Sequence, residues 1–268
     1  MKTKTICIAL LMLTVFAAAP GYTQDKNNAD LAKQAQNPIA NLISLPLQNN
    51  TNLGVGPDDE TQNILNVQPV WPITLNENWN LITRTILPLV SQPDILTSGN
   101  GRINGLGDIT FTGFFSPVDS GKLTWGVGPV LLFPTATNDA LGSDKWGTGP
   151  SVVLLAMPGK WVVGSLFSNV WSFAGSGDND INLFTWQYFV NYNLPNKWYL
   201  TSAPIITANW EADSDNTWTV PFGGGIGKIF NIGKQPVNGQ VSAYYNVETP
   251  DFGADWQLRV QLQFLFPK

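Results

Sequence analysis

Residues 255–268 read DWQLRVQLQFLFPK, and their side chains alternate in character with a period of two. The even-numbered positions are apolar: Trp256, Leu258, Val260, Leu262, Phe264 and Phe266. The odd-numbered positions are mostly polar: Gln257, Arg259, Gln261, Gln263 and Leu265. Successive side chains of a strand leave opposite faces, so this pattern predicts a strand. Strands average about 5–6 residues, whereas a tilted strand that crosses a bilayer needs about 9–11, so the stretch predicts a membrane strand with its even face toward lipid.

The N-terminus has the pattern of a secretory signal peptide. Lys2 and Lys4 precede a mostly apolar run, and small residues follow it. We place the cleavage between Ala17 and Gln24, in the zone of small residues. The apolar run is shorter than the about 20 residues of a spanning helix, so it is not expected to cross a membrane. The predicted organisation is a signal peptide (1–24), a polar periplasmic segment with a weak helical pattern (25–38) and an outer-membrane barrel (39–268).

The chain lacks the side chains that most catalytic and metal sites use. Its single cysteine, Cys7, lies inside the predicted signal peptide, so the mature chain would have no disulfide and no thiolate ligand. It has no histidine, which removes the usual general base and the commonest metal ligand. We therefore predict no enzymatic activity, no metal site and no cofactor. An outer-membrane barrel enzyme is the weakest of the functions considered.

The composition fits a protein whose surface is largely in contact with lipid. Charged residues make up 12% of the chain, against about 25% in an ordinary soluble domain. The mean hydropathy is nevertheless close to zero, at -0.01. A lipid-facing belt that alternates with amide-rich inward positions gives such a composition. A soluble β-sandwich is the competing fold, but its strands would be shorter.

Alternation and turn signals together predict an antiparallel barrel of about twelve strands. The predicted strands are 40–54, 61–73, 79–91, 106–117, 122–134, 146–157, 160–173, 182–194, 197–210, 217–230, 236–248 and 255–266. Short connections such as PG and PN alternate along the chain with longer ones such as EADSDN. Outer-membrane barrels have short periplasmic turns and long extracellular loops, so an even strand number places both ends of the barrel in the periplasm.

Acidic residues concentrate in the long connections and predict an acidic extracellular rim. Its candidate members are Asp58, Asp59, Glu60, Asp139, Asp178, Asp180, Asp213, Asp215 and Asp251. Two interpretations stay open. The residues are either simply solvated loop carboxylates, or they form a negative mouth that attracts cations or bridges lipid phosphates through divalent ions.

Aromatic residues near strand ends predict girdles at the two membrane interfaces. The candidates are Trp161, Trp198, Trp210, Trp256 and Phe266. Trp161 and Trp198 each follow a turn lysine, which suits snorkelling beside an interfacial ring. Trp198 and Trp210 are twelve residues apart on one face, roughly 30 Å at ~3.3 Å per residue and a ~40° tilt.

Arg84 and Arg259 are the only basic residues well inside the predicted wall, and both lie on polar faces. An arginine that faced lipid near the midplane would cost about 2–4 kcal/mol, so we expect both in the lumen. The predicted pore-lining residues are Arg84, Arg259, Asn80, Gln257, Gln261, Gln187 and Asn191. The arginines either pair structurally with Glu248, Asp108 or lumen carbonyls, or they form a basic constriction that selects or orients solute.

Several longer motifs are similar to one bacterial outer-membrane family. They are TRTILPLV, GLGDITFTGFFSP, WGVGPVLLFPTAT, WYLTSAPIITANWEA, GKQPVNGQVSAYYNV and the C-terminal stretch quoted above. The family is described as a MetA pathway of phenol degradation or as a transporter, and some members carry the hormone name neuromedin U, which nothing in this chain supports. The resemblance implies a barrel that passes small aromatic or apolar compounds. One departure is that Pro267 and Lys268 follow the terminal aromatic residue that barrel assembly recognises.

The sequence therefore predicts an outer-membrane channel or transporter for passive passage of small solutes. A structural or adhesive barrel with an occluded lumen is the main alternative, favoured by bulky inward residues such as Phe114, Leu132 and Phe189. The expected partners are outer-membrane lipid, the barrel assembly machinery and a small-molecule solute, and no nucleic acid is expected.

Overall fold

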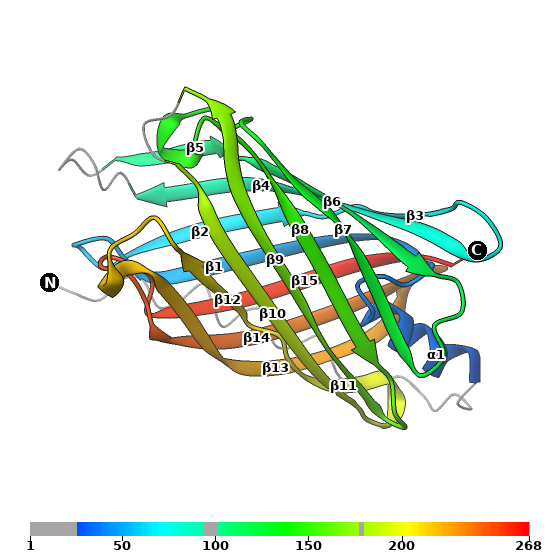
Figure 1. Ribbon diagram of the computed structural model, residues 1–268. Helices are drawn as coiled ribbons and strands as arrows, with labels where there is room; N and C mark the ends of the chain where they lie inside the picture. Colours follow the sequence, from blue (N-terminus) through cyan, green and yellow to red (C-terminus); the bar gives the residue numbers. More distant parts are fainter. Residues whose placement is uncertain (1–25, 94–100, 177–179, 268) are drawn as a thin grey trace, which may run out of the picture.

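The protein is a β-barrel with a short helix at one end (Figure 1). The computed structural model describes residues 26–93, 101–176 and 180–267. The predicted signal peptide and Cys7 lie outside these residues. The helix is α1 (Lys26–Ala35). The strand segments are β1 (Ile43–Val55), β2 (Glu60–Val67), β3 (Val70–Thr74), β4 (Trp79–Pro93), β5 (Arg102–Leu106), β6 (Ile109–Pro117), β7 (Leu123–Phe133), β8 (Lys145–Ala156), β9 (Trp161–Gly175), β10 (Asn182–Asn193), β11 (Trp198–Ser202), β12 (Ile205–Asn209), β13 (Trp218–Ile232), β14 (Gln235–Glu248) and β15 (Trp256–Phe266).

Every neighbouring pair of segments in the sheet is antiparallel, and the sheet closes on itself. The last strand pairs with the first, from Ile43 opposite Phe266 to Leu53 opposite Trp256. Closure is required of a sheet in a membrane, because unpaired backbone groups cannot face lipid. Within the described part of the chain, no helix has the length and apolarity that a membrane crossing needs.

Three of the barrel's wall strands are interrupted, so the segments form twelve strands, as predicted. The interruptions lie at residues 68–69 between β2 and β3, at 107–108 between β5 and β6, and at 203–204 between β11 and β12. Pro69 and Pro204 lie in two of them, and proline has no N–H for the ladder. The predicted ranges 61–73, 106–117 and 197–210 are each one wall strand but not one continuous ladder.

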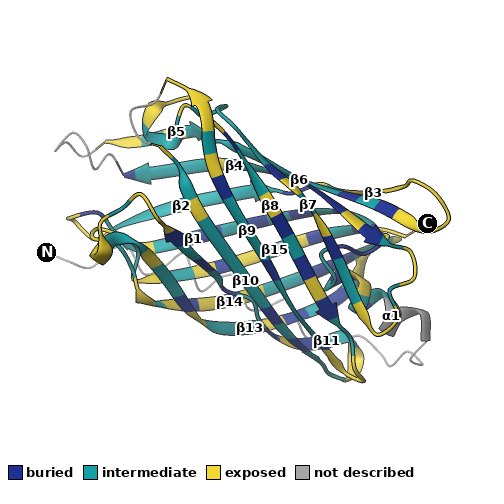
Figure 2. Ribbon diagram, viewed as in Figure 1, coloured by how far each residue is buried: buried dark blue, intermediate teal, exposed yellow. Residues whose placement is uncertain are grey.

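The facing predicted for β15 is confirmed. Leu258, Val260 and Leu262 on the outer face are 42%, 41% and 41% exposed, whereas Arg259 is 2% exposed. Figure 2 shows the same alternation of buried and exposed residues along other wall strands, such as β8 and β9. The outside of the barrel is therefore apolar, and its polar faces turn toward the lumen.

The short turns and long connections lie at opposite ends of the barrel. Helix α1 and the C-terminal end of β15 are both at the short-turn end, below the β3–β4 turn in Figure 1. The side chains of Gln36 and Asn193 exchange hydrogen bonds of 2.9 and 3.3 Å, which fixes the end of α1 against the end of β10. Because the number of wall strands is even, the start of the first wall strand and the end of the last one lie at the same end of the barrel.

The segment between α1 and β1 enters the barrel. Ile39 packs with Ile82, Phe114, Val153 and Leu166 in a buried cluster inside the wall. A second cluster joins this segment to the wall strands: Ala32, Ala35, Ala40, Leu42, Ile229 and Leu265. Apolar burial of this kind is worth about 25 cal/mol per Å², so the segment is held firmly. We call residues 26–42 the N-terminal plug.

Candidate functional site in the barrel lumen

A cavity of about 140 Å³ lies in the lumen next to the N-terminal plug. Residues of the plug form its floor, and inward side chains of β1, β4, β9, β10, β11, β14 and β15 form its walls. Leu166, Phe189 and Val70 give it an apolar side. The remaining wall is rich in amides, and Arg84 and Arg259 also line it.

Arg259 is held in place on several sides. Its Nε donates to Asn50 Oδ1 at 3.1 Å, and its Nη2 donates to Gln257 Oε1 at 2.9 Å. Its Nη1 donates to the carbonyl oxygen of Ala203 at 2.8 Å. Ala203 lies in the interruption between β11 and β12, so this carbonyl is not used by a continuous ladder. The guanidinium also lies 4.9 Å from the centre of the Tyr244 ring, a cation–π distance.

Arg84 is bound much more loosely. Its one described hydrogen bond runs from Nη2 to Gln68 Oε1, at 2.6 Å. Gln68 lies in the interruption between β2 and β3. Two of the three strand interruptions therefore supply a hydrogen-bond acceptor to an arginine, the Gln68 side chain to Arg84 and the Ala203 carbonyl to Arg259. The strands that carry the arginines belong to one arc of the wall, β15–β1–β2–β4, as the order of predicted strands required. Both arginines line the same cavity.

Neither arginine pairs with a carboxylate among the described residues. Of the structural partners expected for the arginines, neither Glu248 nor Asp108 pairs with them in the described chain, whereas a lumen carbonyl does, at Ala203. Asp108 instead accepts hydrogen bonds from the backbone N–H groups of Thr135, Ala136 and Ser143 at 3.1, 3.1 and 2.7 Å. It thereby closes the base of a long connection. Among the described residues, the cavity lining contains two arginines and no acidic residue.

Tyr199 forms part of the polar wall. Its hydroxyl donates to Asn238 Oδ1 at 2.7 Å and lies 3.2 Å from Gln240 Oε1. Its ring lies over Gly227 of the neighbouring strand, where a Cβ atom would overlap the ring. Glycine is therefore needed at position 227 because an aromatic ring approaches the backbone closely.

A chain of side-chain amides leads from Arg259 to the long-connection end of the barrel. Gln257 Nε2 donates to Asn52 Oδ1 at 3.0 Å, and Asn52 Nδ2 donates to Gln62 Oε1 at 2.8 Å. Gln62 Nε2 then donates to Gln92 Oε1 at 2.9 Å, and Gln92 Nε2 donates to the carbonyl of Ala140 at 2.8 Å. The chain crosses β15, β1, β2 and β4 and satisfies inward polar groups above the cavity.

The structure brings together five of the seven predicted pore-lining residues. Arg84, Arg259, Gln261, Gln187 and Asn191 line the cavity. The other two lie apart from it. Gln257 belongs to the amide chain, and Asn80 is buried with its Oδ1 unpartnered among the described residues.

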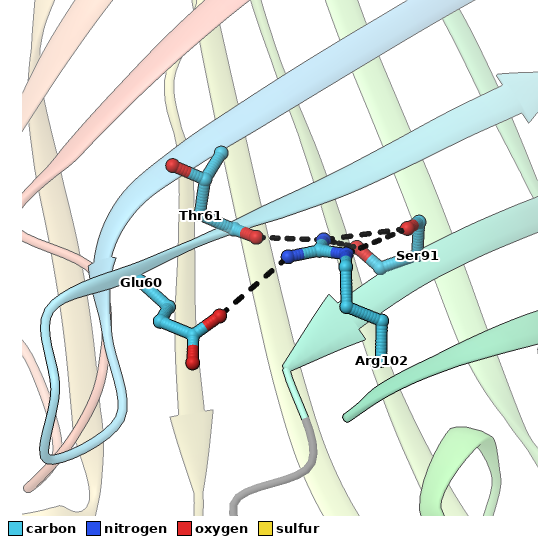
Figure 3. A network of polar contacts seen from close by, with 4 residues as sticks. All are labelled: Glu60, Thr61, Ser91 and Arg102. Atoms are coloured by element: carbon cyan, nitrogen blue, oxygen red, sulfur yellow. Dashed lines mark hydrogen bonds and ion pairs between the residues drawn. The ribbon is translucent and has the colours of Figure 1, made fainter. Parts of the chain in front are cut away.

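The described candidates for the acidic rim all lie at the long-connection end. Most are exposed: Asp58, Asp59, Asp139, Asp180, Asp213, Asp215 and Asp251. Glu60 forms an ion pair with Arg102 at 3.7 Å, and Arg102 also donates to Thr61 and Ser91 (Figure 3). Asp180 pairs with Lys145 at 3.3 Å. Asp178 lies outside the described residues.

The candidate girdle residues lie on the outer face near strand ends. Trp161, Trp210, Trp256 and Phe266 are all exposed. Trp198 is partly covered, because Lys228 Nζ lies 4.7 Å from the centre of its ring. Aromatic neighbours extend the band, as where Trp218 meets Trp210 at 5.4 Å and Tyr245 meets Trp256 at 5.2 Å.

Some residues of the site were not predicted from the sequence. Tyr199, Tyr244 and Gln68 have inward side chains, and alternation within their strands could have suggested the two tyrosines. The Ala203 carbonyl and the plug residue Ile39 carry no comparable signal, because their role depends on contacts between distant segments.

Comparison with known proteins supports the fold. A search of curated proteins finds no match. Among solved structures, the chain resembles an outer membrane channel from Pseudomonas putida F1, at 18% identity over 84% of this chain and 94% of that chain, with a TM-score of 0.62. More distant are the Pseudomonas putida toluene transporter TodX (11% identity, 90% and 91% coverage, TM-score 0.42) and outer membrane phospholipase A from Escherichia coli (14%, 88% and 98%, TM-score 0.44). Of these three similarities, the first carries the argument, and it concerns the fold.

The sequence also matches a family model. The model described as "Putative MetA-pathway of phenol degradation" matches residues 59–268, which include most of the barrel. This chain also covers 94% of the Pseudomonas putida F1 channel, which has a similar fold. The protein is an outer-membrane β-barrel, and it belongs to the family described as "Putative MetA-pathway of phenol degradation".

Proposed function

We propose that the protein is a passive channel for small solutes, including aromatic or apolar compounds, and that it is not an enzyme. The lumen cavity is the observation that carries this proposal. Its volume is about 140 Å³, which suits one small ring. An apolar protein cavity of about 150 Å³ holds one benzene molecule. A wall with an apolar side and an amide-rich side suits a ring that bears a polar substituent.

Membership of a family described by phenol degradation supports the same solute class. The similarity to an outer membrane channel supports passage as the activity. The chain contains no histidine, on which Ser–His hydrolases depend, and this supports a channel over an enzyme.

The proposed route runs from the long-connection end, past the acidic rim and the amide chain, to the cavity. Arg84, Arg259, Gln261, Gln187 and Asn191 would then line the path and orient the solute. The plug lies in the lumen at the short-turn end, where Ile39 packs inside the wall, and we propose that passage through that end requires the plug to move. The plug belongs on the periplasmic side if residues 1–24 are a signal peptide that is removed there.

The exposed aromatic residues are proposed to mark the limits of the lipid belt. Trp161, Trp198 and Phe266 would lie at the periplasmic interface, and Trp210 and Trp256 at the outer one, because rings prefer the headgroup level. Lipid is then the partner of the outer face. The assembly machinery would recognise the end of β15 at Phe266.

A barrel with an occluded lumen is the second candidate function. The observation in its favour is the buried cluster of Ile39, Ile82, Phe114, Val153 and Leu166, which fills part of the lumen. Of the three bulky residues expected to face inward, Phe114 and Phe189 are buried, and Leu132 is partly buried.

Single-channel conductance of the folded protein in a planar bilayer tests the proposal. Discrete current steps are expected, and small aromatic solutes added to one side should interrupt them. Uptake of phenol into proteoliposomes should exceed uptake into protein-free vesicles. If folded, inserted protein gave neither current nor solute uptake, the occluded barrel would be the better description.

A further inference from the structure

We propose that the lumen cavity selects a small organic anion, a ring that carries an ionised carboxylate, over neutral aromatic compounds. The inference rests on the proposed function, because it names the solute class of the same site. The carboxylate would lie at Arg84, with Arg259 beside it, and the ring would lie against Leu166 and Phe189.

The charge balance of the cavity is the first argument. The part of its lining that the structure describes has two cations and no acidic residue. The carboxylates that do form ion pairs in the described parts of the chain, Glu60 and Asp180, pair with Arg102 and Lys145 at the far end of the barrel. Removing a cation from water is costly unless an opposite charge compensates it. A bound anion would supply that charge.

The second argument is that the two arginines differ in how their donors are used. All three nitrogens of the Arg259 guanidinium donate to fixed partners, so this group provides a rigid positive charge. Arg84 has one described hydrogen bond, to Gln68, although a guanidinium has five N–H donors.

The free donors of Arg84 face the cavity. Among the described residues, Asn80 Oδ1 is the single buried side-chain polar atom without a partner, so the unpaired nitrogens of Arg84 are not sealed in the wall. Because Arg84 lines the cavity, we infer that these N–H groups are accessible from it. A planar guanidinium with a free edge binds a carboxylate through two parallel hydrogen bonds.

The third argument is the size and polarity of the remaining space. Leu166 and Phe189 come from β9 and β10, on a different arc of the wall from the arginines. The amides of Gln187 and Gln261 can donate to a second carboxylate oxygen or to a ring substituent. A volume of about 140 Å³ limits the ligand to about one ring.

The acidic rim does not oppose this selection at equilibrium. Its exposed carboxylates lie at the other end of the lumen, and two of its members are already paired with cations. Salt screens exposed charges beyond about 8 Å at physiological ionic strength. The rim therefore affects how fast an anion enters rather than how tightly the cavity holds it.

Isothermal titration calorimetry of the folded, detergent-solubilised full-length protein tests the proposal. The probes are benzoate, benzamide, phenol and benzylamine at neutral pH. Benzoate and benzamide have the same shape but differ in charge. We expect benzoate to bind at least about tenfold more tightly than benzamide or phenol, and benzylamine to bind least, because charge-assisted bidentate bonds are the strongest available.

Arg84→Gln should raise the dissociation constant for benzoate at least about tenfold and leave benzamide binding nearly unchanged. Arg102→Gln is the matched control, because it removes an arginine outside the cavity, and it should bind benzoate as the wild type does. The wild-type comparison of probes stands even if Arg84→Gln folds poorly.

Equal affinity for benzoate and benzamide, or no benzoate binding by folded protein, would overturn the anion site. Phenol uptake into proteoliposomes would still support the channel in that case. Conversely, selective benzoate binding without any solute uptake would support the anion site and count against the channel.

Discussion

At the scale of single residues, the two lumen arginines have different roles. Arg259 connects β15 to Asn50 and to the Ala203 carbonyl, donates to Gln257 within β15, and also contacts the Tyr244 ring. Arg84 has a single described hydrogen-bond partner. The first arginine therefore belongs to the structure of the wall, and the second is the one that we propose meets a solute.

Replacing these two arginines should affect stability unequally. We expect Arg259→Leu to lower the free energy of unfolding by about 3 kcal/mol, because it leaves buried acceptors without a donor. Arg84→Gln should lower it by less than about 1 kcal/mol, since it loses one hydrogen bond. Urea unfolding in lipid vesicles, followed by tryptophan fluorescence, measures both. Equal losses would contradict the assigned roles.

At the scale of elements, β15 shows how clearly a membrane strand separates its faces. Leu262 is 41% exposed on the outer face, whereas the adjacent Gln261 lines the cavity. We expect Leu262→Arg to reduce the yield of folded barrel strongly, at a cost of about 2–4 kcal/mol near the membrane midplane. Gln261→Arg should fold at close to the wild-type level.

Heat-modifiable mobility on gels separates folded from unfolded barrel and measures both yields. Gln263→Arg is a second inward control, because Gln263 also lines the cavity. Similar yields for Leu262→Arg and Gln261→Arg would mean that the outer face of β15 does not contact lipid.

Much of the strand arrangement could be predicted, because the alternation of apolar and polar residues within a strand indicates which of its faces points outward. The twelve wall strands, the closure of β15 on β1 and the arc that carries both arginines follow from local patterns and strand order. The interruptions could not be placed this way. Pro69 and Pro204 mark two of them, but the third, beside Asp108, depends on hydrogen bonds from Thr135 and Ser143, far along the chain.

The same distinction applies to the candidate site. Arg84 and Arg259 could be predicted as lumen residues because a charged side chain in a membrane strand is costly on the lipid-facing side. Whether they pair with acids was left open by the sequence, since pairing depends on which side chains meet across the lumen. Asn80 was expected to line the pore for the same reason of facing, yet it lies outside the cavity lining.

At the scale of the whole molecule, the plug is packed against the barrel wall at the short-turn end. The plug is attached through Ile39 inside the lumen and through the hydrogen bonds between Gln36 and Asn193 at the short-turn end. A channel function therefore requires that these contacts open, at least in part.

A reversible covalent lock tests this requirement. The double variant Gln36→Cys/Asn193→Cys places one thiol on the plug and one at the end of β10, the two segments that these hydrogen bonds join, in a chain whose one natural cysteine lies in the predicted signal peptide. We expect oxidation to suppress conductance and solute uptake, and reduction to restore both. Each single-cysteine variant is a control that should not respond to oxidant. Undiminished uptake in the oxidised form would show that solute does not pass the plug.

The amide chain that starts at Arg259 has a direction as well as a path. Each amide donates away from the guanidinium, through Gln257, Asn52, Gln62 and Gln92, until the last donates to the Ala140 carbonyl. An arginine can only donate, so its position sets the orientation of the first amide, and each amide sets the next. The dipoles along this line are therefore aligned as a unit. The orientation set at Arg259 therefore extends to the surface near Ala140, because reversing any one amide would break the hydrogen bonds on both of its sides.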